Sequence, residues 1–248
     1  MKILLKLNFN FNNESSYVDF GHPETKEEYE EMFKFRYEVY KKKKYFKLNH
    51  KYSNLGLDDY DKEKTTKYFI AKFRGKIIGS VRLIRKEVLP TEKYFVFKEP
   101  EEMKKISKKN RAELSRLTIA PYLYGVYLPR NMVFLLLVYV LVEYAKNNEI
   151  NGGYSFIKNS LRKKINKLKM PINIIKKFSI KYPKDGILYS YFYNQPQNEV
   201  FPVYFLTNDF IKYLDNIFYN KLLFNYSDDE ITLKTNLYTK FLKKIKIL

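Results

Sequence analysis

The most apolar stretch of the chain constrains its fold more than any other feature. Residues 132 to 142 read MVFLLLVYVLV and carry no charge. A helix that is apolar on every side has to be buried on every side, and this run is too short to cross a bilayer, which takes about 20 residues. The stretch therefore predicts a buried helix, from Arg130 to Asn148, that ends at the C-cap signal NGG.

The segments on either side of this helix alternate between strand and helix patterns. MKILLKLNFNF alternates apolar and polar residues as a strand does, and Thr25 with Glu28 forms a capping box at the start of a helical stripe. The runs KYFIAKFRG and KIIGSVRLIRK predict a hairpin that turns at Arg74-Gly75. ELSRLTIA and GYSFI predict strands before and after the buried helix. A short helix is expected around PEEMKKIS, and NSLRKKINKLK predicts a basic helix.

The C-terminal third predicts a continuation of the same domain. Two strands are expected, near Ile187 to Tyr193 and Val200 to Leu206, and the tail from Thr207 predicts two helices that NYSDDE separates. No repeat or low-complexity linker divides the chain, and 45% of its residues are apolar, enough for a sizeable core. We therefore expect one mixed α/β domain, residues 1–206, and a helical C-terminal extension, residues 207–248, that packs on the same domain.

Composition narrows the chemistry. The chain has no cysteine, which excludes disulfides, thiolate metal sites and a cysteine nucleophile. The two histidines, His22 and His50, stand in polar contexts, so neither a histidine triad nor a zinc site is expected. Proton transfer would fall to carboxylates, tyrosines or water. We expect no bound metal and no permanently bound cofactor.

The charge balance points to an acidic partner without naming it. Lysine and arginine outnumber aspartate and glutamate by 47 to 27, a net charge of +20, although the lysine-rich composition of an A+T-rich genome would give the same excess. A basic nucleic-acid-binding protein, with 18% aromatic residues, is the non-enzyme alternative, but no RRM, KH or zinc pattern supports it. The N-terminus has no apolar run with a cleavage site, so a soluble, cytoplasmic protein is expected.

A series of charged residues in short blocks is the sharpest feature. Arg36 lies in FRYEVY, Asp58 and Asp61 in DDYD, Arg82 in GSVRLI, and Glu113 with Arg116 in ELSR. Glu113 and Arg116 are three residues apart, which in a regular strand means opposite faces. In an irregular approach to a strand, both could reach one site. The pair is therefore either a surface ion pair or half of an active site.

The order of elements resembles that of the GNAT acyltransferase fold, a central mixed, mostly antiparallel twisted sheet flanked by helices. The charged blocks resemble the signature of acyl-homoserine-lactone (autoinducer) synthases, in which an arginine before an aromatic residue precedes D-x-[FY]-D, G-x-x-R-L and E-x-S-R. They resemble more closely the bacterial N-acyl amino acid synthases and the exosortase-associated acyltransferases, through RYEVY and through SLRKKINKLKMPI followed by NEVFPVYF. The resemblance covers about Glu28 to Phe205.

Departures from the family patterns bear on the substrates. Ala112 stands where autoinducer synthases usually have a tryptophan, and RKEVLPTE replaces their P-T-T segment, which disfavours a lactone product. The loop APYLYGVYLPRN lacks the Q/R-x-x-G-x-G/A pattern of acetyl-CoA-binding GNAT enzymes. The expected donor is therefore the phosphopantetheine thioester of an acyl carrier protein, with acyl-CoA as the alternative co-substrate.

The resemblance implies roles for the charged blocks. Glu113, with Arg116 beside it, is the candidate catalytic base, acting through a water, unless it only forms an ion pair with Arg116 or Arg82. Backbone groups of Leu117, Thr118 and Ile119 would stabilise the oxyanion where GNAT strands splay. The remaining charged residues would hold a zwitterionic amino substrate, although DDYD alone would suit a solvated turn. They are Arg36, Asp58, Asp61 and Arg82.

Two further groups have plain structural alternatives. An acyl tunnel would be lined from the long helix by Phe134, Leu135, Val138 and Val142, which a simple core needs equally. An acidic carrier protein would dock on the basic helix through Arg162, Lys163, Lys164 and Lys167, which a solvated face also explains. The apolar stripe from Leu237 to Leu248 could touch an anionic membrane, or cover the core of the domain.

The sequence thus predicts an N-acyltransferase that moves a fatty acyl group from an acyl carrier protein to the amine of an amino acid or similar small molecule. An acyl-homoserine-lactone synthase and an acyl-CoA N-acetyltransferase are the alternatives.

Overall fold

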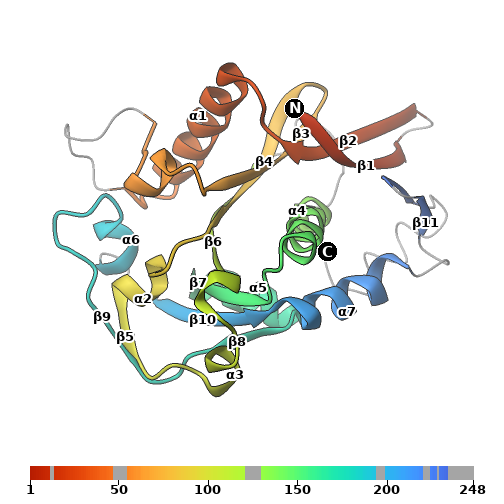
Figure 1. Ribbon diagram of the computed structural model, residues 1–248. Helices are drawn as coiled ribbons and strands as arrows, with labels where there is room; N and C mark the ends of the chain where they lie inside the picture. The colour runs from red at the N-terminus through yellow and green to blue at the C-terminus, as the bar shows by residue number, and fades with distance from the viewer. Residues whose placement is uncertain are drawn as a thin grey trace.

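The computed structural model describes residues 1–11, 14–46, 55–120, 130–193, 199–219, 224–227 and 229–233 (Figure 1). Its main sheet has the strand order β11-β12-β1-β2-β3-β4-β6-β7-β10-β8. Neighbouring strands are antiparallel except β1 with β12 and β6 with β7, which confirms the predicted fold class. The strands are β1 (Lys2–Phe11), β2 (Glu14–His22), β3 (Lys67–Phe73), β4 (Lys76–Ile84), β6 (Arg111–Ile119), β7 (Gly152–Lys158), β8 (Ile172–Ile174), β10 (Val200–Leu206), β11 (Phe224–Ser227) and β12 (Glu230–Leu233).

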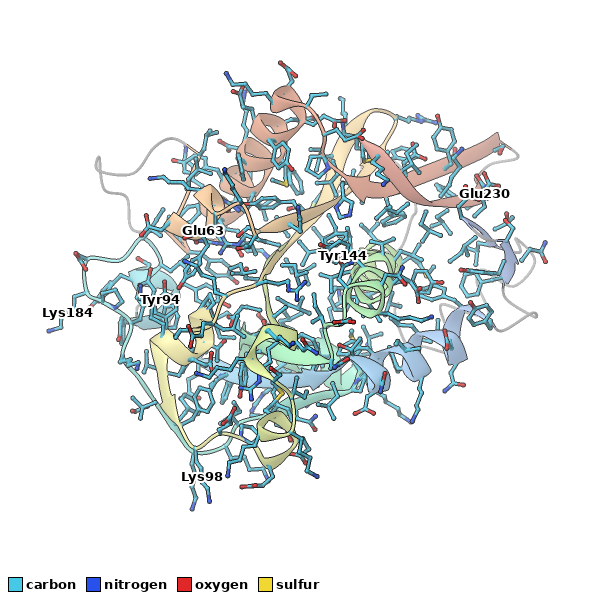
Figure 2. All side chains as sticks on the ribbon, in the orientation of Figure 1. Glu63, Tyr94, Lys98, Tyr144, Lys184 and Glu230 are labelled. Carbon is cyan, nitrogen blue, oxygen red and sulfur yellow. The ribbon has the colours of Figure 1, made fainter. Side chains whose placement is uncertain are left out.

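The predicted buried helix is α4 (Arg130–Asn147), and every residue from 132 to 142 is buried. In Figure 1 it lies at the centre of the molecule, with β1 to β4 on one side and β7, β10 and α7 (Thr207–Phe218) on the other. Side chains fill the space around it, and the ring of Tyr144 on α4 contacts those of His22 and Phe69 (Figure 2). The sheet therefore folds around this one apolar helix.

Local signals in the N-terminal half are confirmed. Helix α1 (Lys26–Lys42) begins with the capping box, in which the Glu28 amide donates to Thr25 Oγ1 and the Thr25 amide to Glu28 Oε2. The β3–β4 hairpin turns through Arg74 and Gly75, both at positive φ, as the twist of a tight hairpin requires. Helix α1 packs against β4 and β6, and so brings Arg36 to the sheet.

Shorter elements cover one end of the sheet. A two-stranded sheet pairs β5 (Phe95–Phe97) with β9 (Phe178–Ile180). The helices here are α2 (Pro90–Tyr94), α3 (Glu101–Lys104), α5 (Asn159–Lys167), α6 (Tyr189–Tyr193) and the 3-10 turns η1 (Asp59–Lys62) and η2 (Lys108–Asn110). The predicted basic helix is α5, and the short helix around PEEMKKIS is α3.

The strand predicted near residues 187 to 193 is wrong, because residues 189 to 193 form α6. Tyr191 and Phe192 are adjacent and both are buried, whereas a half-exposed strand buries alternate residues. The Phe192 ring stacks on Tyr182 with centroids 4.2 Å apart, and Tyr191 packs edge-on against Tyr45. Tertiary aromatic packing therefore decides the local structure.

The tail also departs from its prediction. Helix α7 is present, but the segment expected to separate two helices forms β11 and β12 instead, and β12 pairs in parallel with β1 through Ile231 and Leu7. Both of these residues are fully buried. The second predicted helix, with the apolar stripe from residue 237, lies outside the described residues.

Two irregularities of β6 shape the functional site. Ser80 and Arg82 of β4 pair with Thr118 and Ser115, so three steps along β6 match two along β4, and Arg116 in this bulge has φ +56°. On the other side, β6 pairs with β7 only from Arg111 to Glu113. Beyond that point the two strands separate.

Candidate functional site

Five of the six predicted charged residues form one connected ion network. Arg36 on α1 binds Asp61 through two hydrogen bonds of 2.9 and 2.7 Å. Arg82 on β4 binds both aspartates, at 2.6 Å to Asp58 and 2.7 Å to Asp61. Arg116 on β6 reaches Asp58 at 2.7 Å. The structure thus brings together residues that the sequence separates by up to 80 positions.

The arginines keep both aspartates charged. Burial alone would raise the pKa of Asp58, but Arg82 and Arg116 outweigh it and hold that pKa below its ordinary value. The pKa of Asp61 is lowered in the same way, by Arg82 and Arg36 against its burial. Three arginines against two aspartates leave the network with one excess positive charge, which favours an anionic group of a ligand.

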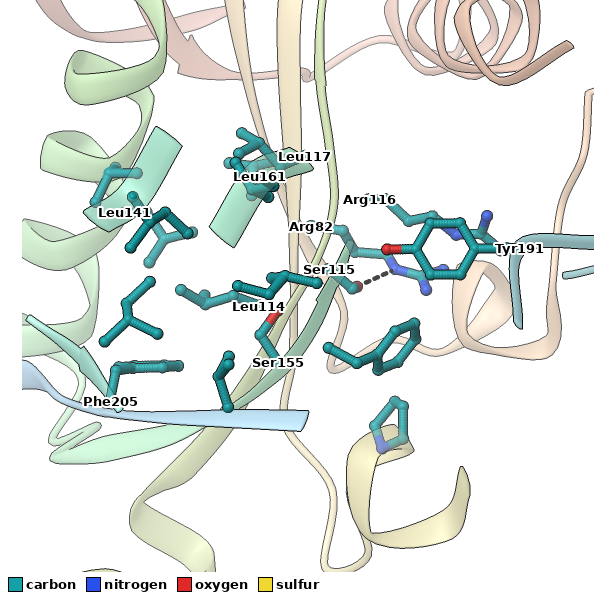
Figure 3. Close-up of a pocket in the computed structure, with 18 of the residues that line it drawn as sticks. Arg82, Leu114, Ser115, Arg116, Leu117, Leu141, Ser155, Leu161, Tyr191 and Phe205 are labelled. Carbon is teal, nitrogen blue, oxygen red and sulfur yellow. Dashed lines mark hydrogen bonds between the residues drawn. The ribbon is translucent and has the colours of Figure 1, made fainter. Parts of the chain in front are cut away.

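A cavity begins at one side of this network (Figure 3). Asp58, Arg82 and Arg116 line it, whereas Arg36 and Asp61 do not, and the side chains of those two are 2% and 1% exposed. Arg36 and Asp61 therefore brace the network from behind. In Figure 3, Arg116 and Tyr191 lie at one end of the cavity, and Leu141 and Phe205 lie at the other.

Arg116 has hydrogen-bonding capacity to spare. Its Nη2 is bound to Asp58, but its Nη1 is buried and has no hydrogen-bond partner within the described part of the chain. The guanidinium lies over the rings of Tyr40 and Phe46, at 5.4 and 5.8 Å from their centroids. A buried N–H group without a partner is costly, so this nitrogen suits a carboxylate supplied by a ligand.

Glu113 stands behind the wall of the cavity and is not one of its lining residues. It is fully buried, and both carboxylate oxygens accept hydrogen bonds from Thr91 on α2, from the amide at 3.0 Å and from Oγ1 at 2.7 Å. Burial raises the pKa of Glu113 to about 8, against these two bonds. Among the described residues, neither Arg82 nor Arg116 forms a salt bridge with it.

The predicted oxyanion segment divides in two. Leu117 lines the cavity, on the part of β6 that has separated from β7. Thr118 and Ile119 do not line it, and they pair with Ser80 and Gly79 of β4.

The residues predicted for an acyl tunnel also divide. Phe134 and Val138 of α4 line the cavity, and so does Leu141, which was not predicted. Leu135 and Val142 are buried on other sides of the helix and do not line it. The cavity therefore takes one side of α4, and the rest of the helix is core.

Comparison with known proteins places the chain in a family. The model of the family described as N-acyl amino acid synthase FeeM matches residues 31–162, more than half of the chain. The chain belongs to this family. It is an acyltransferase, and the matched segment contains all six charged residues discussed above. None of the curated protein sequences compared with the chain matches it.

Solved structures share the fold of this FeeM-family acyltransferase. The AHL synthase LasI is 17% identical, with a TM-score of 0.50 over 77% of this chain and 89% of that chain. The CoA-dependent acyl-homoserine lactone synthase MesI is 16% identical, with a TM-score of 0.52 over 82% and 90%. TofI, solved with an inhibitor and MTA, is 15% identical, with a TM-score of 0.52 over 80% and 96%. At these identities the likeness concerns the fold alone.

The basic helix of the FeeM-family chain adjoins the cavity. Leu161 and Ile165 of α5 line the cavity, while Lys163 and Lys167 are exposed. The other two predicted docking residues bend toward the protein: Arg162 lies over the ring of Phe201, and Lys164 over that of Phe134. Two of the four predicted positions thus face solvent.

Tyrosines around the charged end are functional candidates that the sequence analysis missed. Tyr40, Tyr60, Tyr94, Tyr182 and Tyr191 line the cavity from α1, η1, α2, a loop and α6. Tyr60 lies inside DDYD and could have been found there. Tyr191 carried no usable signal because the sequence of α6 has the pattern of a strand, and Tyr182 lies on a loop where no motif singled it out.

Two searches of the described residues complete the site. No cluster of three or more histidine, aspartate or glutamate side chains is arranged to hold a metal ion there. In the same residues, no helix is both long and apolar enough to cross a membrane.

Proposed function

We propose that this acyltransferase moves a fatty acyl group from an acyl carrier protein thioester to the amine of an amino acid. One observation carries the proposal: a single cavity combines a charged end, at Asp58 and Arg116, with an apolar chamber along α4 and α5. An amphiphilic product, charged at one end and apolar at the other, matches that cavity. The FeeM family name, N-acyl amino acid synthase, agrees with it.

The charged end suits the acceptor. Nη1 of Arg116, which has no partner among the described residues, would bind the carboxylate of the amino acid, and the excess positive charge of the network supports this. The carboxylate of Asp58 would attract the ammonium group before the proton is lost. Arg36, Asp61 and Arg82 hold these two groups in place.

The reaction joins the amine nitrogen to the acyl carbon and breaks the carbon–sulfur bond. The ammonium group gives up two protons in the course of the reaction: one leaves with the carrier thiolate, which departs as the thiol, and the other passes to a base of the protein. We propose Glu113 as the final acceptor of that proton, because its raised pKa of about 8 lies close to that of an amine. Since Glu113 does not line the cavity, a water would have to relay the proton to it.

The chamber side suits the acyl thioester. Backbone N–H groups near Leu117, with Thr118 and Ile119 beside it, are the candidates to stabilise the oxyanion, because β6 has no β7 partner there. Phe134 and Val138 would contact the acyl chain, with Leu135 and Val142 supporting them from the core. No bound cofactor enters this scheme, and the thioester is a co-substrate.

A carrier protein is the proposed donor. Lys163 and Lys167 are exposed on α5, the helix whose opposite side lines the chamber, so an acidic carrier docked there would stand close to the cavity. Arg162 and Lys164 would have to turn outward to take part. Acyl-CoA is the alternative donor, and MesI, of similar fold, is a CoA-dependent synthase.

Thiol release tests the proposal. Long-chain acyl carrier protein and acyl-CoA are offered separately, each with amino acids or with S-adenosylmethionine, and products are weighed by mass spectrometry. We expect thiol release with the carrier donor and an N-acyl amino acid as product. A lactone would assign the alternative synthase activity, turnover with acyl-CoA alone would overturn the donor, and no turnover with any pair would overturn the function.

A further inference from the structure

We propose that Phe205 and Phe210 close the apolar chamber and set the longest acyl chain that it accepts. The inference rests on the proposed function, since it assigns the chamber to the acyl group. It concerns a property that the family match leaves open, because both residues lie beyond residue 162, where the match ends.

The two rings stand at the end of the cavity away from the charged residues. Figure 3 draws Phe205 and Leu141 at the same end of the cavity, opposite Arg116 and Tyr191. Phe210 lines the same cavity from α7, and its ring meets that of Phe205 edge to face, with centroids 5.9 Å apart. Phe205 and Phe210 are 4% and 2% exposed, so the pair forms a wall and not a second opening.

Phe205 is fixed against β7. It pairs in register with Gly153, and a Cβ placed on that glycine would lie 2.9 Å from Phe205 Cζ. Gly153 in turn pairs with Ala112, just before β6 and β7 separate. The ring therefore sits at the apex of the wedge between the two strands, and it cannot move toward β7 to lengthen the chamber.

Phe210 is fixed by the start of its helix. The Thr207 amide donates to the carbonyl of Asn151 at 3.0 Å, and Thr207 Oγ1 donates to the carbonyl of Ile150 at 2.6 Å. Helix α7 also packs along α4. Because both rings are held by rigid elements, an acyl chain that reaches them meets close-packed atoms instead of a yielding surface.

The two rings lead to a quantitative expectation for how kcat/KM depends on the length of the acyl chain. Each methylene buried in the chamber improves transition-state binding by about fourfold in kcat/KM, until the chain meets the wall. One carbon beyond that point has to displace packed aromatic rings, and the gain turns into a loss. The wild type should therefore show a sharp upper limit in acyl length.

The test removes the ring of Phe210. Phe210→Ala and the milder Phe210→Leu are compared with the wild type on an equimolar ladder of straight-chain acyl donors, from medium-length to long, and the products are weighed. We expect the preferred length to move up by about two carbons or more in Phe210→Ala, since the space of several methylenes is opened, and by less in Phe210→Leu.

Phe218→Ala is the matched control. Phe218 lies on the same helix and is fully buried, but its ring contacts Tyr139 and Phe224, and it does not line the cavity. The Phe218→Ala variant should lose stability as Phe210→Ala does, but its products should keep the acyl lengths of the wild type. The same shift in both variants would overturn the proposal, and so would unchanged lengths in Phe210→Leu together with Phe210→Ala.

A second readout separates this inference from the proposed function. Thermal stabilisation by free fatty acids of graded length reports the chamber without any turnover. A wild type that makes no product would overturn the acyl transfer, yet the optimal fatty acid should still lengthen in Phe210→Leu. If the fatty acid length that stabilises most were the same in every variant, the proposal that Phe205 and Phe210 close the chamber would be wrong.

Discussion

Arg116 reaches the cavity because of one backbone angle. In a regular strand alternate residues face opposite sides, yet Leu114, Ser115, Arg116 and Leu117 all line the cavity in succession. The bulge at Arg116, with φ +56°, breaks the alternation and turns its guanidinium toward Asp58. A strained residue at a functional site is a common arrangement, because the site gains a geometry that regular structure does not provide.

Arg116→Lys should weaken acceptor binding. A lysine can still meet Asp58, but it offers no second nitrogen in place of Nη1, and it lacks the flat fork that matches a carboxylate. We expect KM for the amino acid to rise by about tenfold to a hundredfold, the worth of one charge-assisted hydrogen bond, while KM for the acyl donor changes little. Initial rates with each substrate varied in turn measure the two constants.

Arg36→Lys serves as the comparison for this prediction. Arg36 holds Asp61 from outside the cavity. In Arg36→Lys, the loss in the free energy of unfolding, measured in urea, should therefore exceed the loss in binding free energy that the change in acceptor KM reports. If both variants raised the acceptor KM equally, the free nitrogen of Arg116 would not be the binding group.

Glu113→Gln should change both the pH profile and the stability. If Glu113 accepts the proton, the wild-type rate rises with pH through about 8, the pKa of Glu113. The variant should lose this rising limb of the pH profile, and its kcat should fall by about a hundredfold or more. The stability follows the same group. Its pKa is raised from 4.5 to about 8, so the folded protein keeps a proton that the unfolded chain releases.

The sign of the stability effect follows from that raised pKa. The contribution of Glu113 is complete below about pH 4.5 and is lost as the pH rises through about 8. In the glutamine variant, this decline of a few kcal/mol in the free energy of unfolding should disappear. Urea unfolding at several pH values measures it.

Thr91→Val provides the control for the base. It removes the hydroxyl that donates to Glu113 Oε1, a bond that lowers the pKa of the carboxyl. The limb should therefore move to higher pH while kcat at its plateau is kept. An unchanged limb in both variants would reduce Glu113 to a residue that positions α2, whose Pro90 and Tyr94 line the cavity.

At the scale of single residues, the sequence motifs indicate which charged residues belong together, but not which of them line the cavity and which lie behind its wall. The side chains of five residues in the charged motifs lie together in the structure, and their functional roles stay predictions: Arg36, Asp58, Asp61, Arg82 and Arg116. That Arg36, Asp61 and Glu113 stand behind the wall depends on the bulge and on α2. Neither the bulge nor the position of α2 can be predicted from the pattern of polar and apolar residues.

The β3–β4 hairpin offers a test of one element. Gly75 has φ +75°, and a Cβ added there would meet nothing within 4 Å, so a substitution acts through the backbone alone. Gly75→Ala should cost about 1 kcal/mol of stability, since alanine is disfavoured at positive φ. Gly75→Asn should cost less, because asparagine tolerates this region. Urea unfolding of both variants decides: equal losses would exclude the backbone angle as the cause.

Elements with strong local signals were predictable, and elements made by tertiary contacts were not. The capping box, the turn at Arg74-Gly75 and the apolar run of α4 each fix their own structure. Helix α6 is set by an aromatic cluster, and β12 by pairing with β1, more than 200 residues away in the sequence. The sequence patterns also missed β2, although Val18 and Phe20 alternate with more exposed neighbours there.

At the scale of the whole molecule, the described part of the tail, up to residue 233, packs on the body of the sheet. Helix α7 packs on α4, β12 extends the sheet at β1, and Phe210 contributes to the cavity. We therefore propose that residues 207–248 form part of the same domain as residues 1–206. The chamber depends on this part of the chain through Phe210, whereas the family match ends at residue 162.

The net charge of +20 gives a prediction for the whole molecule, because a strong field speeds the encounter with an acidic carrier. Lys163→Glu combined with Lys167→Glu should lower kcat/KM for the carrier donor by about tenfold or more at low salt. The loss should shrink as salt screens the charges, with a Debye length of about 10 Å at 0.1 M. Acyl-CoA, offered as a minimal donor, should be affected much less.

Lys26→Glu combined with Lys34→Glu is the matched control, since it changes the net charge equally from exposed positions on α1. A local docking site predicts that this pair leaves kcat/KM for the carrier donor nearly unchanged. Equal losses in both pairs would mean that the carrier is attracted by the overall charge alone and that α5 is a solvated face. An effect of Lys163 and Lys167 on acyl-CoA as large as on the carrier would instead place their action on the chamber, through Leu161 and Ile165 on the same helix.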